Sequence, residues 1–103
     1  MSSRSQLSAS KRWKTYISFG SDIDLRKDGP GGVNSPANPA EGGAVLDCRE
    51  ILVVSGGVIV LQMSDKAGTN DTSPTLAPGT ILPVQARKII ASGTTVTAVM
   101  VFW

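Results

Sequence analysis

The chain reads GGAVLDCREILVVSGG over residues 42–57 and GTILPVQARKIIASGT over residues 79–94, and the two stretches align without a gap. The offset between the copies is 37 residues, from Ser55 to Ser92. Each copy carries a β-branched apolar run of the kind that pleated strands favour. Each run ends at Ser-Gly, where glycine permits a positive φ. The repeat therefore predicts two β-hairpin units, with turns at residues 55–57 and 92–94.

The apolar runs define the expected fold class. It is an all-β fold, a small β-sandwich or jelly-roll-like barrel of about six to eight short strands. A polar stretch at residues 65–78 is expected to be a loop. Both faces of the final strand are largely apolar, so we expect a second sheet to cover one face and a partner to cover the other. The predicted strands span residues 44–48, 50–54, 58–64, 80–83, 85–91 and 95–102.

The first part of the chain has a different composition. Residues 1–43 are expected to form a long extended N-terminal arm, partly irregular and Pro/Gly-rich, and residues 44–103 the β-sandwich domain. The opening residues are polar and Ser-rich and bury too little to order themselves. Residues 13–19 alternate as a short strand does, although the spacing of Trp13, Tyr16 and Phe19 also fits one helical turn. Either conformation gives the arm an apolar anchor.

Charge and cysteine content exclude several functions. Ten basic and eight acidic residues leave a net charge of +2, too small to indicate a nucleic-acid or membrane binder. No apolar run approaches the ~18 residues of a membrane span. A single cysteine, Cys48, excludes an internal disulfide and is expected to be buried. The basic cluster around Trp13 is expected first to be a solvated basic arm; docking on a neighbouring subunit is the next alternative, ahead of contact with nucleic acid.

Candidate catalytic and metal sites are weak. The chain has no histidine to activate its many hydroxyls, and a Ser64–Lys66 pair is an ordinary occurrence in a polar loop. The glycine-rich residues 29–32 lack the Lys-Ser/Thr ending of a phosphate-binding loop. The spacing of Asp22, Asp24 and Asp28 does not match a twelve-residue calcium loop. We therefore expect no enzyme activity, no cofactor and no bound metal.

The repeated half resembles a known family. Residues 43–49, 51–57 and 77–98, with the terminal Phe102-Trp103, are similar to small structural proteins of tailed phages. The nearest pattern is the head spike base family of phages and gene transfer agents, whose ending matches Leu82-Pro83 and Gly93-Thr94-Thr95. The resemblance covers residues 43–103 and brings no catalytic residues. The Pro/Gly-rich arm is longer than in that pattern, which leaves the position in the virion open.

The resemblance implies a non-enzymatic virion protein on the capsid exterior, bound to the capsid surface or a vertex as a decoration or cement protein or as a spike base. Expected partners are further copies in a trimer or pentamer, the major capsid protein and a spike or fibre protein. No small-molecule substrate, nucleic acid or membrane is expected. A tail or baseplate component and a carbohydrate-binding adhesion module remain alternatives. The expected oligomer or capsid interface consists of Trp13, Tyr16, Phe19, Val99, Val101 and Trp103.

Overall fold

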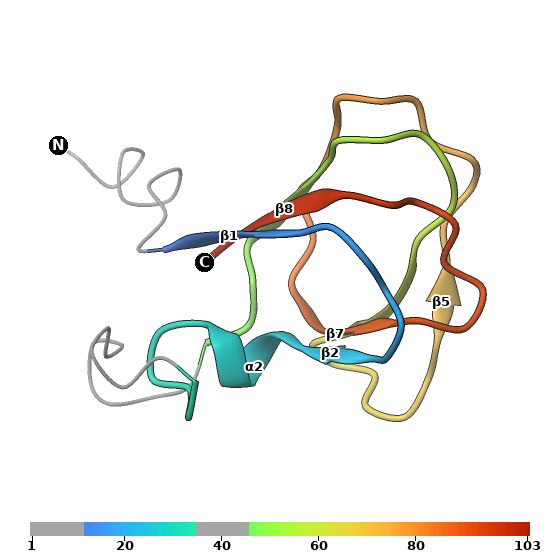
Figure 1. Cartoon of the computed structure of the whole chain (residues 1–103). Coiled ribbons are helices and arrows are strands. Elements are labelled where there is room, and N and C mark those ends of the chain that lie inside the picture. Colours follow the sequence, from blue (N-terminus) through green and yellow to red (C-terminus); the bar gives the residue numbers. More distant parts are fainter. Residues whose placement is uncertain (1–11, 35–45) are drawn as a thin grey trace, which may run out of the picture.

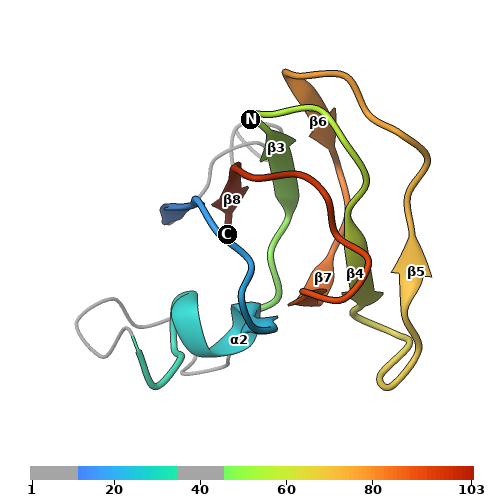
Figure 2. The ribbon, with the colours of Figure 1, turned by 45° about the vertical axis from the view of Figure 1, so that its right-hand side comes forward.

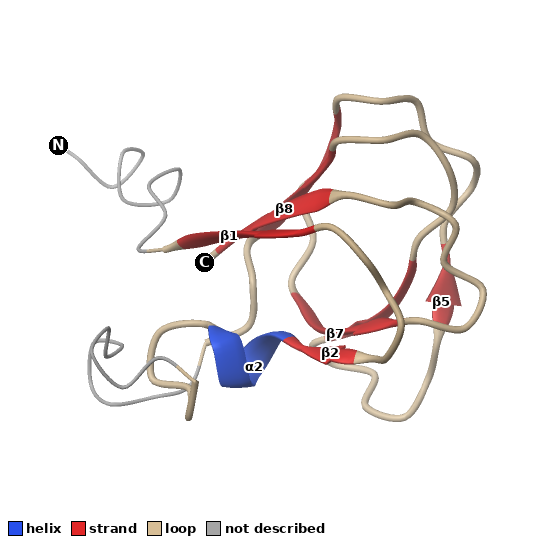
Figure 3. Cartoon of the chain, viewed as in Figure 1, coloured by secondary structure: helices blue, strands red, loops and turns tan. Residues whose placement is uncertain are grey.

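A computed structural model describes residues 12–34 and 46–103 of the chain (Figure 1). In these two ranges the regular structure consists of short strands and one helical turn, as Figure 3 shows by colour. The prediction of a small all-β fold with six to eight strands is confirmed. The elements are β1 (Trp13–Tyr16), β2 (Ile23–Asp24), α2 (Leu25–Asp28), β3 (Glu50–Val53), β4 (Val60–Met63), β5 (Asp71–Thr72), β6 (Thr80–Leu82), β7 (Ala86–Ile90) and β8 (Val99–Phe102).

The strands form two antiparallel four-stranded sheets. Sheet A has the order β1-β8-β3-β6, and sheet B has the order β2-β7-β4-β5. Side chains alternate across the strands, so Ile51 and Val53 of β3 are buried while Glu50 and Leu52 are only half-buried. The inward-facing residues of both sheets share one hydrophobic core.

The two Ser-Gly segments are not hairpin turns, which corrects the expectation from the repeat. β3 belongs to sheet A and β4 to sheet B, so the connection through Ser55 crosses between the sheets, and the connection from β7 to β8 does the same (Figure 2). The first long strand of each copy instead pairs with the second long strand of the other, β3 with β8 and β7 with β4. The sequence repeat is therefore interlocked in the structure: each copy contributes one long strand to each sheet, and that strand pairs with a strand of the other copy.

The two crossings bond to each other at equivalent positions of the repeat. Val58 and Thr95 lie 37 residues apart in the sequence. The Thr95 N–H donates to the Val58 carbonyl at 2.8 Å, and the Val58 N–H donates to the Thr95 hydroxyl at 2.8 Å. Gly57 has φ +141° beside them, and a Cβ there would lie 2.7 Å from the Thr95 hydroxyl oxygen. Glycine is therefore required where the crossings meet.

Residues 12–34 are part of the sandwich rather than of an arm, which corrects the expected boundary between residues 43 and 44. β1 is a strand and pairs with β8 at the edge of sheet A, and β2 pairs with β7 at the edge of sheet B. Figure 1 shows this segment running along both sheets. The rest of the proposed arm, residues 1–11 and 35–43, lies outside the described residues. The sequence-based division missed the contribution because strands this short leave little periodic signal.

The helical turn α2 closes one end of the core. Its N-cap Asp24 accepts a hydrogen bond from the Arg26 N–H at 3.1 Å, a usual way for Asp to start a helix. Leu25 is fully buried, and its carbonyl accepts a hydrogen bond from the Trp103 indole N–H at 3.1 Å. A Cβ on Gly29 would come within 2.2 Å of that indole nitrogen, so only glycine leaves room for the ring.

The two tryptophans are expected to differ sharply in their contribution to stability. Trp103 is 1% exposed and Trp13 is 60% exposed. Replacing Trp103 by alanine should lower the free energy of unfolding by about 3–5 kcal/mol, because it leaves a large cavity and removes one of the two hydrogen bonds to the Leu25 carbonyl. Trp13→Ala, the matched control, should change it by no more than about 0.5 kcal/mol. Urea unfolding followed by circular dichroism measures both, and equal losses would contradict this arrangement of the core.

Candidate docking surface

The structure separates the six residues expected at an interface. Val99, Val101 and Trp103 are at most 1% exposed and lie in the core of the chain itself. Tyr16 is 9% exposed, and Phe19 packs partly buried against the same core. Only Trp13 of the six is largely exposed, so the interface prediction is wrong for the buried side chains. Side chains alternate between the two faces of a strand, and both faces of the last strand are apolar. The sequence therefore does not say which of these faces turns inward.

The opposite face of sheet A holds an unpartnered apolar surface. Strand register places Thr15, Met100, Leu52 and Ile81 in one row across the sheet and Trp13, Phe102 and Glu50 in the next. Their neighbours along each strand are the core residues, so these rows point outward. We call this surface the docking face and define it by Trp13, Thr15, Glu50, Leu52, Ile81, Met100 and Phe102.

The docking face contains two of the five large exposed apolar residues among the described residues. Trp13 is 60% exposed and Ile81 is 57% exposed. Ile17 and Val54 lie just beyond the ends of β1 and β3, at the next outward-facing positions. Their side chains are 76% and 46% exposed. Glu50 is its one charged residue. Contiguous apolar surface of this kind marks interaction sites on soluble proteins.

The outer face of sheet B has a different character. Asp24, Lys88 and Gln62 stand in one row across β2, β7 and β4. Leu61 and Ile89 on the alternate parity belong to the core. An acid, a base and an amide side by side suit contact with water. The sandwich therefore has one polar and one apolar outer face.

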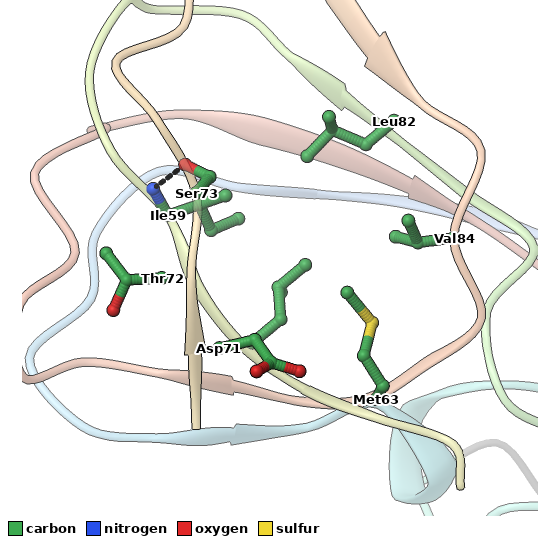
Figure 4. A pocket seen from close by; sticks show the side chains of 8 residues that line it. Ile59, Met63, Asp71, Thr72, Ser73, Leu82 and Val84 are labelled. Carbon is green, nitrogen blue, oxygen red and sulfur yellow. Dashed lines mark hydrogen bonds between the residues drawn. The ribbon is translucent and has the colours of Figure 1, made fainter. Parts of the chain in front are cut away.

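A second feature is a hollow between the sheets, at the edge where β5 ends sheet B and β6 ends sheet A. Its volume is about 120 Å³ and its accessible wall is nearly all apolar. Figure 4 shows Met63, Leu82 and Val84 around the space, with Asp71 and Thr72 on one side. The Ser73 hydroxyl accepts a hydrogen bond from the Ile59 N–H at 3.0 Å, so this polar group is already paired. The eight lining residues are Ile59, Leu61, Met63, Asp71, Thr72, Ser73, Leu82 and Val84.

A polar cluster around Asp28 fastens α2 to β1. The Asp28 carboxylate accepts hydrogen bonds from the Tyr16 hydroxyl and the Asn34 amide, each at 2.6 Å, and Lys14 Nζ lies 3.6 Å away. Burial alone raises the pKa of the Asp28 carboxyl, but these hydrogen bonds and the Lys14 charge hold it below the ordinary value. Burial and the bond to Asp28 raise the pKa of Tyr16 above its ordinary value. The cluster is structural, because its donors and acceptors are used within the chain.

The Ser64–Lys66 pair is not assembled. The Ser64 hydroxyl donates to the Asp47 carboxylate, which Arg26 also binds. Lys66 instead pairs with Asp71 at 3.7 Å. Lys66 is therefore not placed to act as a base for Ser64, and nucleophilic catalysis by this pair has no geometric support.

Nor do the acidic residues considered for calcium converge on one site. Asp22 accepts a hydrogen bond from the Ala91 N–H at 2.8 Å, while Asp24 caps α2 and Asp28 lies in its own cluster. Within residues 12–34 and 46–103, no group of three potential ligands could hold a metal ion. The same ranges contain no helix long and apolar enough to span a membrane.

Cys48 is fully buried beside β7, as the sequence predicts. The Ala86 N–H donates to its sulfur at 3.4 Å, and its own S–H lies 3.5 Å from the Val84 carbonyl. Burial raises the pKa of the Cys48 thiol to about 11. This environment favours an inert structural thiol.

A scan of protein-family models, a search of curated proteins and a search of solved structures each gave no match to this chain. The assignment of function therefore rests on the surfaces described above.

The Asp28 cluster should make stability depend on acid. A carboxyl whose pKa is depressed by folding stabilises the native state above its ordinary pKa of 3.8, and this contribution is lost as the pH falls through the lower folded value. Asp28→Asn should therefore cost about 1–3 kcal/mol at pH 7 and less as the pH falls below 4. Unfolding at a series of pH values measures the difference. Asp65→Asn, in an exposed loop, is the control, and a penalty for Asp28→Asn that grew in acid would contradict the cluster.

Cys48 should resist thiol reagents until the chain unfolds. A thiol pKa of about 11 rather than 9.0 leaves about 100-fold less thiolate at pH 8. Reaction with an aromatic disulfide should therefore be at least ~100-fold slower in buffer than in 8 M urea. Comparable rates in the two solvents would show that the thiol is accessible in the folded chain.

Proposed function

We propose that this chain is a non-enzymatic structural protein of a virion, attached to the capsid exterior as a decoration or cement protein or as a spike base. The observation that carries the proposal is the docking face, an apolar sheet surface that residues 12–34 and 46–103 leave uncovered. Trp13, Ile81 and their neighbours on this face present flat apolar area to a protein surface. The resemblance of residues 43–103 to head spike base proteins supports the same conclusion.

The size of the docking face indicates how it would be used. Four strands at about 4.8 Å spacing and about four residues each give a face well below the ~800 Å² per partner of a stable one-to-one complex. A face this small binds weakly alone. A shell that presents many identical sites would hold joined copies firmly through multivalency. This requirement favours the predicted homo-oligomer and the major capsid protein as partners.

The alternative functions use the same face differently. A tail or baseplate component would also dock by an apolar sheet face, so the geometry does not separate it from a capsid role. A carbohydrate-binding module would need polar groups around an exposed aromatic ring. Trp13 pairs with Phe102 across the sheet, and the same row continues to Glu50. Five of the seven residues of the docking face are apolar, and this share favours a protein partner over a glycan.

The proposal is tested with capsids that lack this chain, prepared from the source whose genome encodes it. Added protein should co-sediment with these capsids, and Ile81→Asp should weaken the binding at least tenfold, because it places a charge in an apolar contact. Ser92→Asp, at an exposed position between β7 and β8 that lies outside both the docking face and the hollow, is the matched control and should bind as the wild type does. Equal binding of Ile81→Asp and wild type, or a source genome without a capsid gene, would contradict the proposal.

A further inference from the structure

We infer that copies of this chain join head to tail, with Val33 of one copy entering the hollow between β5 and β6 of the next. The inference rests on the proposed function, because a small docking face needs joined copies. It concerns a different surface, however, and assigns an occupant to the hollow. The hollow and Val33 are the two apolar features that neither the core nor the docking face explains.

The hollow has the size and chemistry of a receptor for one aliphatic side chain. Its volume is about 120 Å³, and a closed apolar cavity of about 150 Å³ is known to accept benzene. Its polar rim groups are already engaged, Asp71 with Lys66 and Ser73 with Ile59. A branched aliphatic group therefore fits it better than a polar ligand. The two bordering strands, β5 and β6, are both sheet edges, which leaves the opening clear of further strands.

Val33 is the one large exposed apolar residue that remains. Of the five in the described residues, Trp13, Ile17, Val54 and Ile81 belong to the docking face or continue its parity. Val33 is 76% exposed and lies outside that face. An isopropyl group so exposed has most of its surface available to a partner.

The segment that carries Val33 is held firmly on both sides. The Gly32 N–H donates to the Gly29 carbonyl at 2.9 Å, and the Asn34 N–H donates to the Lys27 carbonyl at 2.8 Å. The Asn34 side chain also binds Asp28 at 2.6 Å. A Cβ on Gly32 would lie 2.3 Å from the Lys27 carbonyl oxygen, so the turn is closely packed. A side chain presented in this way loses little freedom on docking.

Val33 and the hollow lie on opposite sides of the molecule. Figures 1 and 2 both place α2 and the segment after it on one side and β5 on the other. One copy therefore cannot fill its own hollow, and the contact joins two different surfaces. Such contacts close into rings when the rotation between copies permits it, which suits a trimer or pentamer. Charge agrees as well, because exposed Lys27 lies in the same segment as Val33, and exposed Asp65 lies two residues from Met63, which lines the hollow.

Cysteine pairing between copies tests the contact directly. In a Cys48→Ala background, a Val33→Cys variant is mixed with a Thr72→Cys variant and oxidised without any capsid present. A disulfide requires the two Cβ atoms to approach within about 4 Å. The mixture should therefore give a cross-linked dimer at least tenfold faster than Val33→Cys mixed with Val54→Cys, the control on the docking face. Equal rates in the two mixtures would overturn the inference.

Sedimentation provides the second readout. The wild-type chain should assemble with increasing concentration, and Val33→Asp should weaken assembly by about 10–100-fold, because the hollow offers no partner for a carboxylate. Val33→Ile should retain assembly. A wild-type chain that stays monomeric yet binds capsids would overturn this inference and leave the proposed function intact. A chain that assembles normally but does not bind capsids would overturn the proposed function and leave this inference intact.

Discussion

The hydrogen bond from the Trp103 indole to the Leu25 carbonyl is the contact on which the rest of the structure depends. It joins the last residue to the helical turn α2, 78 positions earlier in the chain. The indole also fills the space left by Gly29. The backbone N–H of Trp103 donates to the Arg12 carbonyl at 2.9 Å, and this hydrogen bond helps to set the register of β1 on β8. Without this anchor the first strand would lose its alignment, and one side of the docking face would lose its position.

The interlocked repeat explains how so short a chain closes a core without a disulfide. Each copy gives one long strand to each sheet, so separating the sheets would require both crossings to part. The crossings are bonded to each other through Val58 and Thr95. Residues 12–34 then add an edge strand to each sheet and contribute Tyr16 and Leu25 to the core. The folded chain thus covers its own interior, and the surface that remains for a partner is an outer face of the sandwich.

The sequence predicted fold class, the approximate strands and the burial of Cys48, because β-branched runs and glycine positions are local signals. Pairing partners were not predictable in this way. The spacing around Ser55 and Ser92 suits a hairpin or a crossing equally, and only long-range contacts decide between them. β2 and β5, with two residues each, are defined by their neighbours rather than by their own periodicity. Met100 and Phe102 could have been found as outward-facing residues once Trp103, with its need for a buried acceptor, was placed inside.

The outer faces of the two sheets differ in polarity, and the open edges of sheet A bear on this difference. Both ends of sheet A are open strands, β1 and β6, and an exposed edge next to an apolar face favours uncontrolled pairing with other chains. Sheet B differs, because Asp24 and Lys88 lie in one row of its outer face. The apolar groups are tolerable when a partner covers them in the assembled state. The chemistry of the face is therefore consistent with the proposal of a protein that functions by being attached.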